Sequence, residues 1–172
     1  MAAFDSRTLR DALGSFVTGV TVITTRDADG APHGLTVNSF SSVSLDPPLV
    51  LWSQASAAPS HAAFRAASHF AVNILAEDQL DVSTRFARRG DKFGASGWRE
   101  GLAGLPLLEG CVAWLECRLL ETHAGGDHRV FIGHVERLER TERRPLVFGG
   151  GRYLSVRPHH ISPPLPLGAG VA

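Results

Sequence analysis

The residues best suited to bind a ligand form one short run of small polar side chains, residues 36–42. A plain core strand would carry Val, Ile or Leu where this run has Ser, Thr and Asn. Alternation along a strand would place Thr36 and Asn38 on one face and Val37 and Ser39 on the other. Short hydroxyl and amide groups suit the binding of a flat polar ligand against backbone N–H groups. An ordinary edge strand with a solvated polar face is the alternative.

A second candidate for chemistry is His128, which ends the sequence Gly125-Gly126-Asp127-His128. Two glycines let a backbone approach another molecule closely, and Asp127 could orient the imidazole. A loop histidine beside an acid can equally be a solvated turn residue, and the spacing alone does not decide between these two interpretations.

The other residue types that could do chemistry are not arranged as a known motif. The eight histidines lack the i, i+4 pairing or Cys-x-x-Cys spacing of a metal site, so no metal is expected. A Gly-x-Gly-x-x-Gly turn, a P-loop and a Gly-x-Ser-x-Gly elbow are all missing from the sequence. The two cysteines, Cys111 and Cys117, are too far apart along one straight strand to bond, which predicts reduced structural thiols.

Composition excludes several classes of partner. The chain has 172 residues, with 17 Lys and Arg against 17 Asp and Glu, so nothing indicates a nucleic-acid partner. No apolar run approaches the roughly 20 residues of a membrane helix. Residues 1–5 do not look like a secretory signal, and we expect a cytoplasmic protein with no membrane partner.

Hydrophobic periodicity indicates the elements that must position these residues. Strands are expected at 20–25, 33–42, 49–53, 69–75, 108–121 and 129–139, and helices at 5–17, 60–67 and 77–89. Two short segments, 146–148 and 152–156, surround a triple glycine. Residues 90–104 are expected to form a long loop. Because strands and helices do not alternate, we predict a mainly β domain over residues 1–157, an antiparallel six- to seven-stranded Greek-key barrel. Residues 158–172 should form an extended or disordered tail.

Taken in order, these segments resemble the short-chain flavin reductases, the reductase components of two-component flavin-dependent monooxygenases. The similarity runs from about Phe16 to Tyr153 and is carried by FVTGVTVITT (16–25), GLTVNSFSSVSLDPPLV (34–50), FAVNIL (70–75), GGDH (125–128) and GRY (151–153). It implies a split β-barrel that binds FMN or FAD, usually as a homodimer with the flavin near the subunit interface. The implied reaction is hydride transfer from NADH or NADPH to the flavin, with reduced flavin supplied to a separate monooxygenase.

The resemblance also implies three groups of site residues. The flavin ring would lie along the polar run, at Thr36, Val37, Asn38, Ser39, Ser41 and Ser42. The flavin phosphate would lie near Ser53, Gln54, Ser60, His61, Phe86 and Arg88. The nicotinamide nucleotide would meet His128, as the catalytic residue, and Gly151, Arg152 and Tyr153. Donors aimed at the flavin would stabilise the negative charge that a hydride brings, so no acid–base pair is required.

The sequence is also compatible with two other functions. A split barrel can also be a non-catalytic flavin- or haem-binding protein, since fold does not fix function. A flavin oxidase acting on a small phosphorylated amine would need a basic pocket, for which the sequence offers only Arg85–Arg89 and Arg140–Arg144. The sequence does not choose between FMN and FAD or between NADH and NADPH, and it does not identify the partner monooxygenase.

Overall fold

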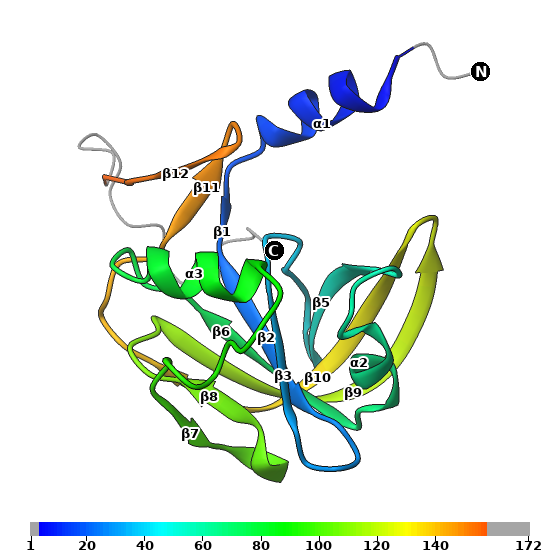
Figure 1. Cartoon of the computed structure of the whole chain (residues 1–172), viewed down its shortest axis with the longest axis vertical. Coiled ribbons are helices and arrows are strands. Elements are labelled where there is room, and N and C mark those ends of the chain that lie inside the picture. Colours follow the sequence, from blue (N-terminus) through cyan, green and yellow to red (C-terminus); the bar gives the residue numbers. More distant parts are fainter. Residues whose placement is uncertain (1–3, 158–172) are drawn as a thin grey trace.

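The computed structural model describes residues 4–157, and its centre is a seven-stranded antiparallel sheet (Figure 1). In spatial order the strands are β3 (Pro32–Val37), β2 (Thr21–Arg26), β6 (His69–Ile74), β9 (Ala113–Gly125), β10 (His128–Arg140), β5 (Pro48–Ala55) and β4 (Ser41–Leu45). This curled antiparallel sheet confirms the predicted fold class. The predicted tail, residues 158–172, lies outside the described residues.

Tight turns join the paired strands, as the glycine positions require. In the β2–β3 hairpin the Asp27 carboxylate accepts hydrogen bonds from the backbone N–H groups of Asp29 and Ala31, and Gly30 has a φ of 81°. The β9–β10 hairpin turns at Gly126, where φ is 66°. Positive φ favours glycine, so both turns follow directly from the local sequence.

The polar run is not one strand, and that prediction is wrong. Strands β3 and β4 lie at opposite edges of the sheet, with a bend over residues 38–40 between them. At this bend the Ser39 hydroxyl donates to the Ser53 carbonyl at 2.9 Å and accepts from the Ser53 N–H at 3.0 Å. A side chain thus takes the place of a backbone partner, which ends the strand and draws β3 toward β5.

Two apolar clusters form the core. One contains Trp52, Phe64 and Phe131 beneath α2 (His61–Ala66), with the Trp52 and Phe131 rings stacked at 4.4 Å. The other contains Phe86 of α3 (Leu80–Ala87) and Trp114. Helices α2 and α3 therefore stay on the barrel by burying one aromatic residue each.

The predicted loop 90–104 is also partly wrong. It contains strand β7 (Trp98–Glu100), which pairs with β8 (Pro106–Leu108), and the 3₁₀ turn η1 (Leu102–Gly104). The Arg26 guanidinium lies 5.2 Å from the Trp98 ring centre and donates to the Gly104 carbonyl. This segment is ordered by contacts distant in sequence, which its glycine-rich composition does not reveal.

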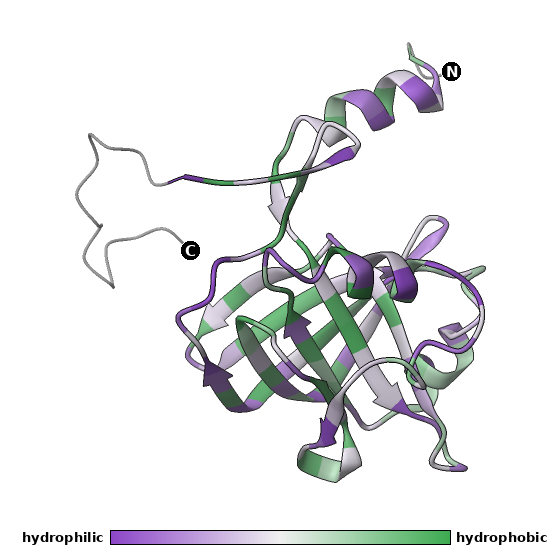
Figure 2. Cartoon of the chain, turned by 60° about the vertical axis from the view of Figure 1, so that its left-hand side comes forward, coloured by the Kyte–Doolittle hydropathy of each residue, from purple (hydrophilic) through white to green (hydrophobic). Residues whose placement is uncertain are grey.

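The N-terminal helix projects from the barrel beside a small second sheet (Figure 2). Helix α1 (Ser6–Gly14) is capped by the preceding Asp5, whose carboxylate accepts the Thr8 N–H, and none of the helix residues is buried. The second sheet consists of β1 (Thr18–Gly19), β11 (Val147–Gly149) and β12 (Arg152–Leu154). Next to the helix, Phe16 is 78% exposed, which leaves an apolar surface open at this end of the chain.

Candidate functional site

A cavity of about 800 Å³ lies between β3, the segment before α2, the end of α3 and the residues that follow α3. Of the predicted site residues, four line it: Thr36, Ser60, Phe86 and Arg88. They come from separate parts of the chain, and the fold brings them to one place. A cavity of this size is in the range of cofactor sites.

Close packing of α3 on β3 forms one wall of the cavity. Phe86 is fully buried and meets the Phe93 ring edge-on, with the ring centres 5.1 Å apart. Gly34 of β3 faces this ring, and a Cβ built there would lie 2.6 Å from Phe86 Cε1. Thr36 Oγ1 donates to the Ser83 carbonyl of α3 at 2.6 Å. Phe86 therefore shapes the wall chiefly by anchoring the helix.

Cations dominate the cavity beyond α3. Arg88, Arg89 and Lys92 line it, whereas Asp91 is the one acid among the described lining residues. The Asp91 carboxylate accepts the N–H groups of Phe93 and Gly94, which leaves it less available to offset these charges. Such a group of cations is suited to binding a phosphate.

Lys92 joins the two sides of this wall. Its ammonium donates to the carbonyls of Gly34 and Phe86, both at 3.0 Å, and burial lowers the pKa of Lys92. An ammonium has three N–H groups, so one remains for a ligand. Lys92 and Arg89 were not among the predicted site residues, although three cations within five residues after α3 could have indicated them.

A hydrogen-bonded network supports the opposite wall. Gln54 is 1% exposed; its amide nitrogen donates to Ser60 Oγ at 3.0 Å and its oxygen lies 3.0 Å from His61 Nδ1. Because that oxygen can only accept, His61 donates from Nδ1. Burial lowers the pKa of His61, and the nearby Arg129 and Arg65 lower it further. Gln54 and His61 lie outside the cavity lining and hold Ser60 in it.

The rest of the polar run lies beyond this cavity. Val37 ends β3, and Asn38 is exposed at the bend that follows. Ser41 and Ser42 are exposed at the start of β4, and Ser39 is half-buried against Ser53. The single chain thus brings Thr36 to the cavity and leaves these neighbours beside it.

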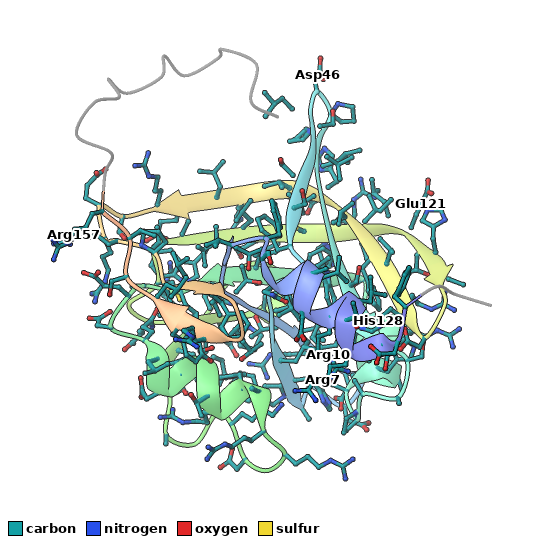
Figure 3. The ribbon with its side chains drawn as sticks, turned by 90° about the horizontal axis from the view of Figure 1, so that it is seen from above. Arg7, Arg10, Asp46, Glu121, His128 and Arg157 are labelled. Carbon is teal, nitrogen blue, oxygen red and sulfur yellow. The ribbon has the colours of Figure 1, made fainter. Side chains whose placement is uncertain are left out.

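The predicted nicotinamide residues are not gathered into the cavity. His128 is exposed in the β9–β10 hairpin, with Nδ1 2.7 Å from Asp127 Oδ1, and lies on the other side of the molecule from α3 (Figure 3). This hydrogen bond lowers the pKa of Asp127. Gly151 and Arg152 are exposed, whereas the Tyr153 hydroxyl lies 2.9 Å from Ser83 Oγ of α3.

The described residues offer neither a metal site nor a membrane-spanning helix. Within residues 4–157, His, Cys, Asp and Glu form no group of three or more that could hold a metal ion. The described helices include none with the length and apolar character needed to cross a membrane. Both Cys111 and Cys117 are buried and free, and burial raises the pKa of each thiol to about 12.

Known proteins similar to this chain are named as flavin reductases or as reductase subunits of monooxygenases. The chain is 47% identical to the FMN reductase (NADH) SmoA of Agrobacterium fabrum over 87% of its own length and 85% of that protein. It is 42% identical to HsaB of Mycobacterium tuberculosis, a flavin-dependent monooxygenase reductase subunit, over 94% of this chain and 88% of that one. It spans 50% of a probable flavin reductase of Rhizobium meliloti, so some relatives are about twice as long.

Solved structures similar to this chain also include flavin reductases. The NADH:FAD oxidoreductase SgcE6 of Streptomyces globisporus, in complex with NAD and FAD fragments, has a TM-score of 0.86 and 38% identity. The match covers 93% of this chain and 99% of that one. The sequence pattern of the flavin reductase-like domain matches residues 13–157. The chain therefore belongs to the flavin reductase-like family.

Proposed function

We infer that this protein is an NAD(P)H:flavin oxidoreductase that passes a hydride from NADH or NADPH to FMN or FAD. The reduced flavin serves a separate flavin-dependent monooxygenase. One observation carries this inference: the cavity gathers Thr36, Ser60, Phe86 and Arg88, which the resemblance to flavin reductases names independently of the structure.

The donors that line the cavity fit a flavin phosphate. Arg88, Arg89 and the third N–H of Lys92 supply charged donors, and Ser60 supplies a hydroxyl held by Gln54. Bound flavin would supply the hydride acceptor of the reaction. The protein's own part is to fix the ring at Thr36 and the neighbouring polar run, with N–H and hydroxyl donors in place before charge develops.

We propose that His128, Gly151, Arg152 and Tyr153 meet the nicotinamide nucleotide. Because His128 lies on the other side of the molecule from α3 and Tyr153 (Figure 3), His128 and Tyr153 would come from two different chains. Asp127 supports this role for His128, because its carboxylate lies 2.7 Å from Nδ1 and would leave Nε2 to face a ligand. Tyr153 is joined to the cavity wall through Ser83, which would couple the nucleotide site to α3.

We also propose that the protein is a homodimer. The exposed apolar side chains of the projecting segment support this: Leu13 is 66%, Phe16 78% and Val17 51% exposed. Apolar groups clustered in this way usually mark an interface. Sedimentation of the full chain should give twice the mass of one chain, and Phe16→Asp should give a larger monomer fraction. A wild-type monomer at micromolar concentration would contradict the proposal.

A cytoplasmic location is part of the same proposal. The free thiols of Cys111 and Cys117 are typical of a reducing compartment. Fractionation of expressing cells, with a cytoplasmic enzyme and a periplasmic enzyme as markers, would test it, and recovery with the periplasmic marker would contradict it.

The function is tested by absorbance at 340 nm with purified protein, NADH or NADPH, and added riboflavin, FMN or FAD. We expect oxidation that saturates in added flavin and ranks the two nucleotides. A tightly bound flavin with no oxidation of either nucleotide would instead indicate a non-catalytic flavin-binding protein.

A further inference from the structure

The cavity extends well beyond the end where the flavin ring is proposed to lie. It follows β3 from Pro32 to Thr36, four residue steps that give about 13 Å at about 3.3 Å each. Thr36 is the first residue of the polar run, whereas the Pro32 end lies nearest the β2–β3 turn. A ligand with its ring near Thr36 and its phosphate near Arg88 would leave the Pro32 end free for a second group.

One cation of the lining, Lys92, is placed between these two ends. Arg88 and Arg89 follow α3 directly, and Lys92 reaches back to the Gly34 carbonyl in the middle of β3. Their three charges match a diphosphate, whose oxygens extend over more than one cation, better than a single terminal phosphate.

The Pro32 end has a fixed aromatic ring in its wall. His33 Nε2 lies 2.7 Å from Asp27 Oδ2, and the other oxygen of that carboxylate is held by the Ala31 N–H at 2.9 Å. The imidazole is therefore oriented by the turn itself, with Nδ1 left for a ligand. Pro32, next to His33 in β3, also lines the cavity, so this end combines a flat ring with apolar surface. This is the chemistry that binds a purine base.

We propose that this end of the cavity binds the adenosine half of FAD, with the pyrophosphate held by Arg88, Arg89 and Lys92, and that FAD is therefore the preferred flavin. FMN ends at its phosphate and would leave His33 and Pro32 without a partner. The proposal rests on the proposed function and deepens it, because it names the flavin and assigns His33 as the residue that selects it.

Calorimetric titration of the oxidised protein with riboflavin, FMN, FAD and 5′-AMP tests the assignment without turnover. We expect FAD to bind about tenfold more tightly than FMN, the size of one base-stacking contact. We expect AMP to compete with FAD and to leave riboflavin binding unchanged. Equal affinities for FMN and FAD would overturn the proposal. So would AMP that raises the KM for NADH without displacing FAD, since the site would then belong to the nicotinamide nucleotide.

Variants separate the adenosine end from the rest of the site. His33→Ala and Arg89→Ala should each weaken FAD binding by about fivefold to tenfold while the Kd for riboflavin stays within about twofold. His123→Ala is the matched control, because His123 is an exposed histidine paired with Glu121 outside the cavity. Loss of all flavins together in both variants, or an unchanged FAD affinity, would overturn the assignment. NADH oxidation by the wild-type protein with added FMN or riboflavin would show that the proposed function stands even where the FAD assignment fails.

Discussion

Gly34→Ala should push α3 away from β3 and so disturb one wall of the cavity. Gly34 is buried beneath α3, and the added Cβ would lie 2.6 Å from Phe86 Cε1 and 2.8 Å from Cδ1. Carbon atoms in contact are usually about 3.5–4.0 Å apart, so the ring would have to move by about 1 Å. Phe86 is fully buried against Phe93, which leaves the helix as the part that moves.

The expected cost follows from two opposing effects. Overpacking of a core costs about 1–3 kcal/mol, while replacing glycine by alanine stabilises the folded state by about 0.4–1 kcal/mol through the unfolded chain. We therefore expect the free energy of unfolding to fall by about 1–2 kcal/mol. For a chain of this size that lowers Tm by about 2–8 °C.

Flavin binding should weaken as well, because Lys92 donates to both Gly34 and Phe86. Moving α3 from β3 would lengthen one of these hydrogen bonds and shift the cation, for which we expect a flavin Kd about tenfold higher. Gly19→Ala is the matched control, since nothing lies within 4 Å of a Cβ at Gly19. Thermal melting and flavin titration measure both effects. A Gly34→Ala protein that melts at or above the wild-type temperature and binds flavin equally well would refute this reasoning.

Three other substitutions test single side chains. His128→Ala should lower kcat/KM for NADH by about tenfold or more and leave the flavin Kd within about twofold, whereas equal losses in both would make His128 structural. Tyr153→Phe removes the partner of the buried Ser83 hydroxyl and should lower stability by about 1 kcal/mol in urea unfolding; no change would mean that this hydrogen bond does not stabilise the fold. His61 has a lowered pKa, so the unfolded chain binds its proton more readily, and stability should fall as the pH drops below about 6.5. His61→Asn should therefore lose less stability than wild type between pH 7 and 5.5, and equal losses would contradict this origin.

The strands were predictable where the signal is local. Strand β2 and the Asp27–Gly30 turn form from their local residues alone. Branched side chains favour a strand, and the Gly30 φ of 81° favours glycine. The segment around strand β7 is held instead by Arg26, far away in the sequence, and the bend at residues 38–40 depends on Ser53. Ser39 forms hydrogen bonds with the backbone of Ser53, fourteen residues later, and no pattern within the polar run predicts that contact.

The site was predictable in its types of residue more than in its arrangement. The resemblance pointed to Ser60 and Arg88, and both line the cavity. It did not point to Lys92, because a lysine in a glycine-rich segment looks like solvated surface until the fold turns it toward the Gly34 carbonyl. Gln54 was expected to meet the phosphate, yet its amide is engaged with Ser60 and His61 inside the protein.

The division between these residues bears on the proposed dimer. Thr36 lines the cavity, whereas Asn38, Ser41 and Ser42 follow it in the chain and are exposed, and Arg152 is exposed as well. A flavin held by one chain alone would leave most of the ring's expected partners open to water, which would weaken the hydrogen bonds that stabilise a reduced ring. The apolar segment around Phe16 is also exposed, and burying it against another surface would be favourable. Binding of a second copy would both shield the flavin ring from water and bury the apolar segment. We therefore expect flavin affinity to rise with protein concentration through the range where dimers form.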